Sequence, residues 1–315
     1  MVAEGSGDQA QDLAPACPVR RCTIPAVIPQ FLRGHGLRPS SLKARAGRLV
    51  GPSRISRRRF EQFLADVDSR PPVSLPPEPP GTLAVVVPAY AHEAYLPAML
   101  ESIVAQTRLP DEVVLVDDCS LDGSRAILQA FVASDPLPGG ACRLIVNESN
   151  VGQSASLNRG IAAATSDLVM ILNDDDYLMH DAVATMLTWF RLHPEAALIG
   201  ANHVRLAGPE ALTAAPKLST DYARPDQPLE VRSPQEARRY RDSEDLRMTH
   251  SGMCFRKVAW DAVGGYRPDP RDRILVYSER DFQIRVNALF PVAIGLHTPL
   301  AFWRTDSSVD RQLNS

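Results

Sequence analysis

Three consecutive aspartates, Asp174, Asp175 and Asp176, follow the apolar run of residues 168–172 with only Asn173 between them. Neighbouring carboxylates repel one another, and a charge removed from water without a partner is costly. Two explanations are open at this point. The aspartates form an acidic turn in solvent, or they bind Mg²⁺ or Mn²⁺ through one or two oxygens and leave the other coordination positions to water and substrate phosphates. A cation held in this way would neutralise a diphosphate leaving group.

The segment after the first expected strand excludes one class of nucleotide-binding protein. Enzymes that bind nicotinamide cofactors need a glycine-rich phosphate loop at this position. Residues 88–95 have the sequence PAYAHEAY, which contains no glycine. A nucleotidyltransferase would have a metal site of the same kind, but it also needs a glycine-rich, basic phosphate loop at this position. This class therefore stays a less favoured alternative.

The elements that must position these residues begin at residue 83. Fully apolar strands that alternate with amphipathic helices indicate an α/β fold with a mostly parallel sheet, covered by helices on both faces. The expected strands span residues 83–90, 112–118, 142–148 and 167–176, and the expected helices span residues 95–106, 121–134, 152–164 and 181–194. Asp122 and Asp181 are placed to cap the second and fourth helices. A further strand, a short helix and a Gly-Gly turn are expected after residue 250, followed by a helix and a closing strand.

Polar clusters lie where three of the expected strands end. These clusters are residues 88–90, 117–118 and 173–176. Ligands of parallel α/β sheets bind beyond the carboxyl ends of the strands. Surface acidity has no reason to gather at one edge of a sheet, so this coincidence favours a binding site over a solvated turn.

Composition limits the class of protein. The 315 residues are 44% hydrophobic and 23% charged, with a net charge of −3, which indicates a soluble globular protein and no nucleic-acid partner. No apolar stretch is long enough to span a bilayer, and the N-terminus lacks the order of a secretion signal. The five cysteines are scattered, so we expect reduced thiols and a cytoplasmic location, with attachment to the inner face of the membrane as an alternative.

The N-terminal part differs in charge from the rest of the chain. Residues 20–70 carry twelve Lys and Arg against three Asp and Glu, and a proline-rich stretch follows at residues 71–81. We therefore expect a helical or irregular extension with its linker at residues 1–80, a first half-domain at 81–206 and a second at 207–315. Phe60, Phe63, Leu64 and Val67 share one helical face. Peripheral membrane contact, packing on the main domain and contact with a second subunit all stay open for this helix.

The motifs that follow residue 82 resemble, in order and spacing, those of the inverting glycosyltransferases of family 2, which have a Rossmann-like GT-A fold. The resemblance covers residues 82–308 and rests on five segments. They are Pro88-Ala89-Tyr90-Ala91-His92-Glu93, Val116-Asp117-Asp118-Cys119-Ser120-Leu121-Asp122-Gly123, Asn150 with Gly152, Asn158 and Gly160, Leu172-Asn173-Asp174-Asp175-Asp176, and Gly264-Gly265-Tyr266.

The resemblance implies roles for particular residues. The nucleotide-sugar contacts would come from Pro88, Ala89, Tyr90, Glu93, Asp117, Asp118, Asn158, Asn173 and Asp174. Asp117 or Asp118 would accept a hydrogen bond from an imide N–H of uracil or thymine. Asp175 is the implied metal ligand, with Asp176 and Asp306 as further candidates for binding Mg²⁺ or Mn²⁺.

Three positions depart from the family pattern or fit it loosely. Asn173 replaces the first aspartate of the D-x-D motif, and the family's C-terminal histidine is absent from the segment WRTD, where Asp306 stands nearby. Alignment of DFQIR with the family's pattern makes Glu279 the candidate catalytic base and Asp281 the alternative. His250 is left out of the mechanism, because a lone histidine is more often structural.

The resemblance thus implies transfer of a sugar from a UDP- or dTDP-sugar to a hydroxyl group, with inversion at the anomeric carbon. The acceptor would be a carbohydrate or a lipid-linked sugar in polysaccharide, glycolipid or glycoconjugate biosynthesis. A non-catalytic relative that only binds the nucleotide sugar is the alternative from another class. Acceptor specificity is expected in the loose segment 207–250.

Overall fold

The computed structural model describes residues 55–206, 227–240, 246 and 248–304, all within the unit formed by residues 37–315. The strands are β1 Leu83–Ala89, β2 Glu112–Asp117, β3 Cys142–Val146, β4 Leu168–Ile171, β5 Tyr177–Leu178, β6 Leu198–Leu206, β7 Glu230–Arg232, β8 Cys254–Arg256 and β9 Val292–Arg304. The helices are α2 Arg57–Asp68, α3 Leu96–Val104, α4 Ser124–Ala133, α5 Gln153–Ala163, α6 Ala182–Leu192, α7 Pro234–Ala237, α8 Lys257–Val263 and α9 Ser278–Leu289, with a 3₁₀ turn at Pro270–Asp272.

In this part of the chain the strands form one mixed sheet in the order β3-β2-β1-β4-β8-β6-β9-β5, with β7 paired to β9. Strands β3, β2, β1 and β4 are parallel, as the alternation of strands and helices predicts, and β6 is parallel to β9. Every residue of β1, β2 and β4 is buried, which is why β1, β4 and the interior of β2 between Glu112 and Asp117 are apolar. The predicted α/β fold with a mostly parallel central sheet is confirmed.

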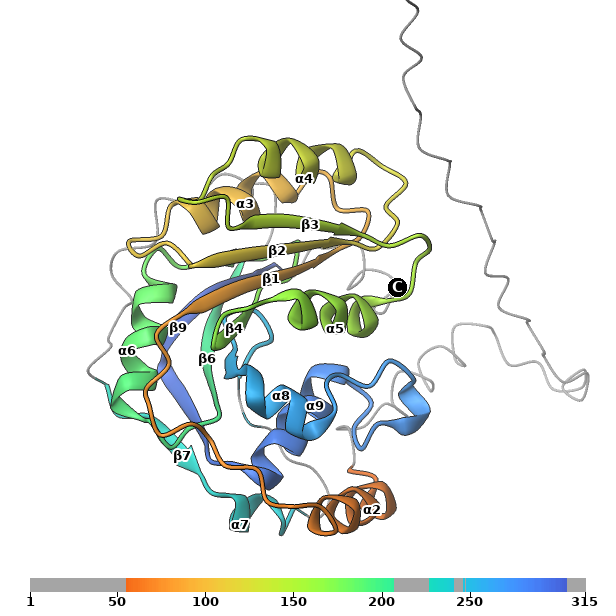
Figure 1. Ribbon diagram of the computed structural model, residues 1–315, viewed down its shortest axis with the longest axis vertical. Coiled ribbons are helices and arrows are strands. Elements are labelled where there is room, and N and C mark those ends of the chain that lie inside the picture. The colour runs from red at the N-terminus through yellow and green to blue at the C-terminus, as the bar shows by residue number, and fades with distance from the viewer. Residues whose placement is uncertain (1–54, 207–226, 241–245, 247, 305–315) are drawn as a thin grey trace, which may run out of the picture. The chain divides into compact units, whose positions relative to one another are not determined.

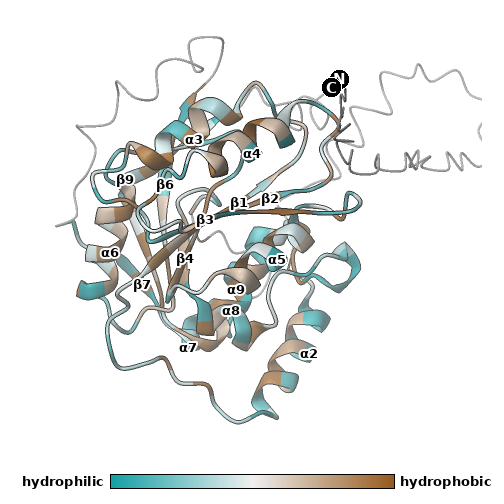
Figure 2. Cartoon of the chain, turned by 45° about the horizontal axis from the view of Figure 1, so that its top comes forward, coloured by the Kyte–Doolittle hydropathy of each residue, from teal (hydrophilic) through white to brown (hydrophobic). Residues whose placement is uncertain are grey.

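Helices cover both faces of the sheet (Figure 1). On one face, the side chains of Val85 and Val87 pack in a cluster with residues of α3, α4 and α6. On the other face, Ala84 and Val86 pack with residues of α2, α5, α8 and α9. The alternation follows from the two-residue period of a strand, and Figure 2 shows the apolar strands enclosed between the two layers.

Helix α5 lies unusually close to the sheet. A Cβ atom at Gly160 would stand 2.7 Å from Cγ1 of Val86 and 3.0 Å from Cγ2 of Val116. Such distances are shorter than real Cβ contacts. Glycine at this position therefore allows the helix that follows β3 to pack directly on β1 and β2.

The antiparallel strand β8 brings a distant segment to the functional edge of the sheet. It pairs with β4 on one side and with β6 on the other. The start of β8 consequently lies beside the end of β4, where the Gly252 amide donates to the Ile171 carbonyl (2.9 Å) and the Asn173 amide donates to Oγ of Ser251 (3.0 Å). Residues 250–253 thus border the acidic loop that follows β4.

The two predicted helix caps differ from expectation. Asp122 lies one residue before Gly123, the N-cap of α4, and its Oδ1 accepts from the Ser124 amide at 3.1 Å. Asp181 occupies the N-cap position of α6, but its side chain makes no capping hydrogen bond. The backbone conformation of Asp181 (φ −118°, ψ 17°) lies outside the extended region in which a cap side chain reaches the helix amides.

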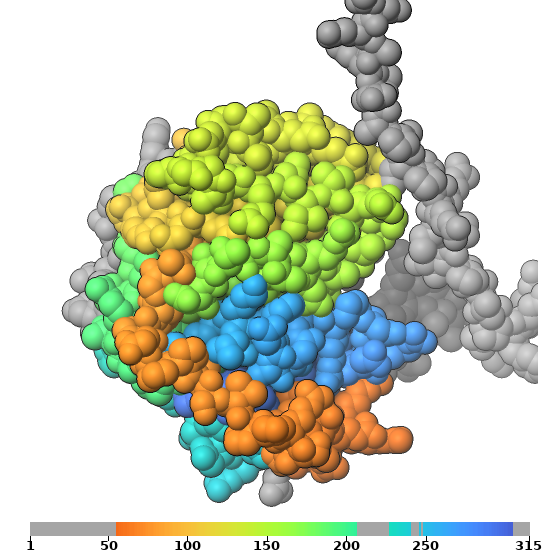
Figure 3. Space-filling model, in the orientation of Figure 1, coloured from red at the N-terminus to blue at the C-terminus, as the bar shows by residue number. Residues whose placement is uncertain are grey.

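Helix α2, the described helix of the N-terminal part, packs on α8 and α9. Phe60 is fully buried and Phe63 is 6% exposed, both within the cluster that contains α8 and α9. The Ser56 amide donates to the Ile274 carbonyl (2.8 Å), and Nη1 of Arg59 donates to the Arg273 carbonyl (2.9 Å). Of the three interpretations left open for this helix, the structure supports packing on the main domain. Figure 3 shows residues 55–80 lying across the surface beside α8 and α9.

The structure tests the expected state of the cysteines for three of them, and it tests the described helices for membrane-spanning character. Cys142 and Cys254 are buried free thiols, as expected, whereas Cys119 is disulfide-bonded, so the expectation of reduced thiols is wrong for that residue. Among the helices that the structure describes, none has the length and apolar character needed to cross a bilayer. Residues 1–54, and residues 207–226 of the segment expected to set acceptor specificity, lie outside the described residues.

Replacing Phe60 by alanine tests whether α2 is an integral part of the domain. The lost burial and the cavity left behind should lower the free energy of unfolding by about 3–5 kcal/mol, measured by urea denaturation of the full chain. The exposed neighbour Arg58→Ala serves as the control and should leave the transition midpoint unchanged. A Phe60→Ala midpoint equal to that of the wild type would show that α2 contributes nothing to the fold.

Candidate active site

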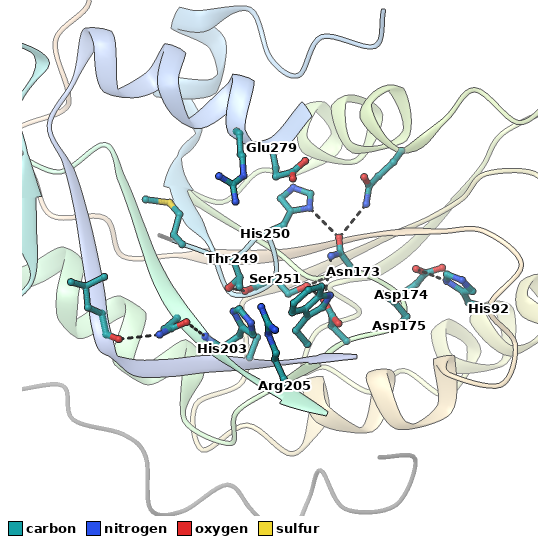
Figure 4. Close-up of a pocket in the computed structure, with 18 of the residues that line it drawn as sticks. His92, Asn173, Asp174, Asp175, His203, Arg205, Thr249, His250, Ser251 and Glu279 are labelled. Atoms are coloured by element: carbon teal, nitrogen blue, oxygen red, sulfur yellow. Dashed lines mark hydrogen bonds and ion pairs between the residues drawn. The ribbon is translucent and has the colours of Figure 1, made fainter. Parts of the chain in front are cut away.

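A cavity of about 880 Å³ opens at the edge of the sheet where β4 ends (Figure 4). Its wall combines the loop after β1, the loop after β4, the segment before β8, the start of α9 and the strands β6 and β9. The lining residues are His92, Gln153, Asn173, Asp174, Asp175, Asp176, Asn202, His203, Arg205, Met248, Thr249, His250, Ser251, Glu279, Arg280, Leu296, His297, Ala301 and Trp303. The cavity therefore contains Asn173 to Asp176 and Glu279 among the predicted site residues.

Asp174 links the loops that follow β1 and β4. Its Oδ2 accepts from the Tyr90 amide at 2.9 Å, and its Oδ1 lies 2.9 Å from Nδ1 of His92. Burial lowers the pKa of His92, but the hydrogen bond and charge of Asp174 and the charge of Asp175 outweigh it, so the pKa lies above its usual value. The pairing restrains the position of both loops on this side of the cavity.

Asp176 is 1% exposed and serves the framework of the site. Its Oδ1 accepts from the Arg304 amide (3.0 Å), and its Oδ2 accepts from Oγ of Ser251 (2.5 Å) and from Nδ2 of Asn173 (3.2 Å). Burial, together with the charge of Asp175, raises the pKa of Asp176 to about 7. Both of its oxygens are thus engaged with the protein, whereas Asp175 is only half-buried and lines the cavity.

A chain of hydrogen bonds runs from the loop after β4 toward α9. Nδ1 of His250 lies 3.1 Å from Oδ1 of Asn173, and Nε2 of His250 lies 3.0 Å from the hydroxyl of Tyr266. Burial lowers the pKa of His250, and the nearby charge of Glu279 partly opposes this effect. Burial and the Glu279 charge both raise the pKa of Tyr266. Sequence reasoning left His250 out, but its side chain connects Asn173 to the surroundings of Glu279.

The two candidate bases lie in different environments. Glu279, in the first turn of α9, is half-buried and lines the cavity. Asp281 is fully buried, does not line the cavity, and accepts from the Ile274 amide (2.6 Å) and from Nε of Arg285 (2.9 Å). Arg285 also donates to the carbonyls of Val263 (2.7 Å) and Gly265 (2.8 Å). Burial lowers the pKa of Arg285 to about 10, which leaves it protonated at neutral pH.

The predicted nucleotide contacts on the first two strands do not line this cavity. Asp118 accepts from Nδ2 of Asn147 (2.7 Å) and from the amides of Val151 (2.8 Å) and Gly152 (2.7 Å), so its carboxylate holds the loop before α5. Asp117, which is fully buried, accepts from Nε of Arg125 at 2.9 Å.

The loop after β1 is likewise attached to the loop after β2. Oε2 of Glu93 accepts from the Gly123 amide at 2.5 Å, and the amides of Ala91 and His92 donate to Oγ of Ser120 (3.1 Å) and Ser124 (3.0 Å). Pro88 and Ala89 are the buried last residues of β1, whereas Tyr90 is 44% exposed beside them. Tyr90 and Glu93 are therefore the exposed residues of this group.

Asn158 holds the Gly-Gly turn in place. Its Nδ2 donates to the Tyr266 carbonyl (2.7 Å), and its Oδ1 accepts from the Tyr266 amide (2.8 Å). Gly264 and Gly265 have φ angles of 72° and 67°, in the left-handed region that glycine adopts readily. Asn158 therefore positions Tyr266, and through Tyr266 it positions His250.

The carboxylate oxygens in the loop after β4 are suitable ligands for a hard divalent cation whose other coordination positions are filled by water and phosphate. Within the described residues, no three His, Cys, Asp or Glu side chains are arranged to hold a metal ion. Asp306 lies outside these residues. The half-buried carboxylate of Asp175 matches the case in which one or two protein carboxylates and the substrate phosphates share the ion.

Comparison with known proteins places the chain in a family. The sequence model of Glycosyl transferase family 2 matches residues 84–262. The chain belongs to this family. An uncharacterized glycosyltransferase of Haemophilus influenzae is 33% identical over 117 residues, which make up 37% of this chain and 37% of that relative. The matched region thus spans little more than a third of the relative's length.

Solved structures confirm the fold. The structure of S. aureus TarS 1–349 in complex with UDP superposes with a TM-score of 0.53 at 16% identity, over 71% of this chain and 60% of that chain. The mannosyltransferase PcManGT from Pyrobaculum calidifontis, in complex with GDP-Man and Mn²⁺, gives a TM-score of 0.50 at 16% identity, over 81% of this chain and 67% of that chain. This member of Glycosyl transferase family 2 therefore has the GT-A fold predicted from its motifs.

Alanine replacements at the two candidate bases should separate a structural carboxylate from an accessible one. Asp281→Ala leaves Arg285 buried without its ion-pair partner, which should lower the free energy of unfolding by about 3–5 kcal/mol. Glu279→Ala should change the free energy of unfolding by less than about 1 kcal/mol. Chemical denaturation of the two variants compares them directly, and equal stability would contradict this distinction between the two carboxylates.

Proposed function

We propose that this protein is an inverting glycosyltransferase that moves a sugar from a UDP- or dTDP-sugar to a hydroxyl group of a carbohydrate or lipid-linked acceptor. One observation carries the proposal. The half-buried carboxylates of Asp175 and Glu279, from two separate elements, line the same cavity. In metal-assisted transfer with inversion, one carboxylate would hold the cation that neutralises the diphosphate, and a second would accept the proton of the acceptor hydroxyl.

The donor would occupy the side of the cavity near the loops after β1 and β4. Asn173 offers an amide to the ribose or diphosphate, and the Asp174–His92 pair holds the two loops together. The exposed ring of Tyr90, whose amide is bonded to Asp174, is placed to contact the base. The complex of TarS with UDP supports a uracil nucleotide, whereas PcManGT is in complex with the guanine nucleotide GDP-Man. The thermal response to GDP and to UDP distinguishes the two bases.

Asp175 would hold the divalent cation, together with the donor phosphates. When bound, the cation would neutralise the negative charge that develops on the departing diphosphate. The Mn²⁺ in the complex of PcManGT supports this choice of ion. Asp176 is better assigned to the framework than to the metal, because its oxygens are already hydrogen-bonded to Ser251, Asn173 and the Arg304 amide.

Glu279 would act as the general base. Its carboxylate removes the proton of the acceptor hydroxyl while the hydroxyl oxygen forms a bond to the anomeric carbon. The bond between this carbon and the diphosphate oxygen breaks, and its electron pair leaves with the nucleoside diphosphate. Attack from the face opposite to the leaving group inverts the anomeric configuration. His250, hydrogen-bonded to the buried Tyr266, forms part of the cavity wall against which the acceptor would lie.

The metal assignment predicts the thermal response to nucleotides. UDP or dTDP with Mn²⁺, at about a hundredfold excess over Kd, should raise Tm by about 5 °C or more, because ligand binding stabilises the folded state. Asp175→Ala should retain the response to nucleotide alone and lose the additional response to Mn²⁺. The exposed Asp261→Ala on α8 is the matched control. A shift produced by GDP alone, or an unchanged Mn²⁺ response in Asp175→Ala, would contradict the proposal.

The base assignment predicts a catalytic defect without a binding defect. Glu279→Gln keeps the shape of the side chain but removes its basicity, so release of nucleoside diphosphate from the sugar donor should fall by a factor of about 10² or more. The Kd for UDP with Mn²⁺ should stay within about twofold. The exposed Glu101→Gln on α3 is the control for loss of one negative charge. Wild-type rates in Glu279→Gln would transfer the role to another group.

A further inference from the structure

The wall of the cavity formed by β6 and β9 differs in charge from the acidic wall. His203 and Arg205 are two residues apart on β6, so their side chains leave the strand on the same side. Both line the cavity, and Figure 4 shows them on the strand across from His250 and Glu279. Trp303 of β9 stands next to Arg205 in the strand register and lines the cavity as well. Neither His203 nor Arg205 belongs to the motifs on which the family resemblance rests.

Arg205 is held by an aromatic ring. Its guanidinium carbon lies 5.0 Å from the centre of the Trp303 ring, in a cation–π contact. Within the described residues, it makes no hydrogen bond or ion pair, in contrast to Arg285, whose donors bind Asp281 and two carbonyls. A guanidinium carries five N–H donors. Arg205 therefore presents an oriented cation to the cavity while keeping its hydrogen-bonding capacity.

His203 adds a second polar group on the same side. Its ring meets Trp303 edge-on, with the ring centres 5.0 Å apart and an interplanar angle of 87°. Its Nδ1 is buried and has no hydrogen-bond partner among the described residues. A buried ring nitrogen in this state is costly unless something binds to it. The pairing of β6 with β9 shifts register at residues 201–203, directly before the side chain of His203 enters the cavity wall.

We propose that Arg205 and His203, supported by Trp303, form a subsite for a phosphoryl group carried by the acceptor. This inference extends the proposed function and rests on it, because the phosphoryl group is assigned to the acceptor of the proposed sugar transfer. A planar guanidinium suits a phosphate because two parallel N–H groups can bind two oxygens at once. The subsite lies on β6 and β9, whereas the groups assigned to the donor lie on the loops after β1 and β4. The phosphoryl group belongs to a sugar phosphate or to the phosphate of a lipid-linked acceptor.

Titration with inorganic phosphate tests the subsite without knowledge of the acceptor. The probe is followed by NMR through the Trp303 indole signal, assigned with Trp303→Phe. We expect phosphate to shift this signal in the wild type, and Arg205→Gln to weaken phosphate binding about tenfold. Arg205→Lys should restore part of the affinity, and Arg191→Gln, an exposed arginine on α6, should leave it unchanged. No phosphate-dependent shift in the wild type, or equal affinity in Arg205→Gln, would overturn the proposal.

A second set of titrations identifies the source of the phosphoryl group. Glucose 6-phosphate should bind at least about tenfold tighter than glucose, and farnesyl phosphate tighter than farnesol, with the larger preference marking the source. Arg205→Gln should abolish both preferences and leave the Kd for UDP with Mn²⁺ unchanged. A weaker Kd for UDP in this variant would assign the subsite to the donor and overturn the proposal. Failure of the wild type to bind any nucleotide would refute the proposed function, while the phosphate titration would still decide whether the subsite exists.

Discussion

The geometry of the site depends on the hydrogen bonds that the buried carboxylate of Asp176 accepts. It receives hydrogen bonds from Asn173, from Ser251 and from the Arg304 amide, which belong to the loop after β4, the segment before β8 and the strand β9. Three segments that lie far apart in the sequence are thus joined at one group. A carboxylate buried in this way is costly, and its pKa of about 7 reflects that cost. The hydrogen bonds offset the cost and leave Asp175 at the cavity surface.

A second buried group positions the opposite side of the cavity. The Asp281–Arg285 pair ties α9 to the end of α8, to the Gly-Gly turn and to the Ile274 amide. The Ile274 carbonyl in turn accepts from the Ser56 amide at the start of α2. The N-terminal extension is therefore connected, through one residue, to the helix that carries Glu279. This continuity explains why a helix outside the family motifs is packed against α8 and α9.

Several motif residues have structural contacts where the resemblance implies ligand contacts. Asp118, Glu93 and Asn158 use their oxygens to hold loops, namely the loop before α5, the loop after β1 and the Gly-Gly turn. A motif records which residue types occur together in a family, and it does not say whether a side chain faces a ligand or the protein. The five motifs therefore identified the family and the fold correctly, while the ligand roles of these residues stay predictions.

The sequence by itself determined the alternation of strands and helices, the parallel part of the sheet, the family and the place of the acidic loop, because burial on both faces and turn chemistry are local properties of the chain. Alignment of DFQIR with the family's pattern pointed to Glu279, which lines the cavity, while its role as the base stays a prediction. Only the tertiary structure decided that Asp281 is buried with Arg285, that Asp176 supports the framework, and that His250 and Arg205 reach the cavity. These outcomes depend on the antiparallel insertion of β8 between β4 and β6 and on the pairing of β6 with β9. Contacts between segments far apart in the chain leave no periodic signal in the sequence, because they are set by which edges of the sheet meet when the chain folds.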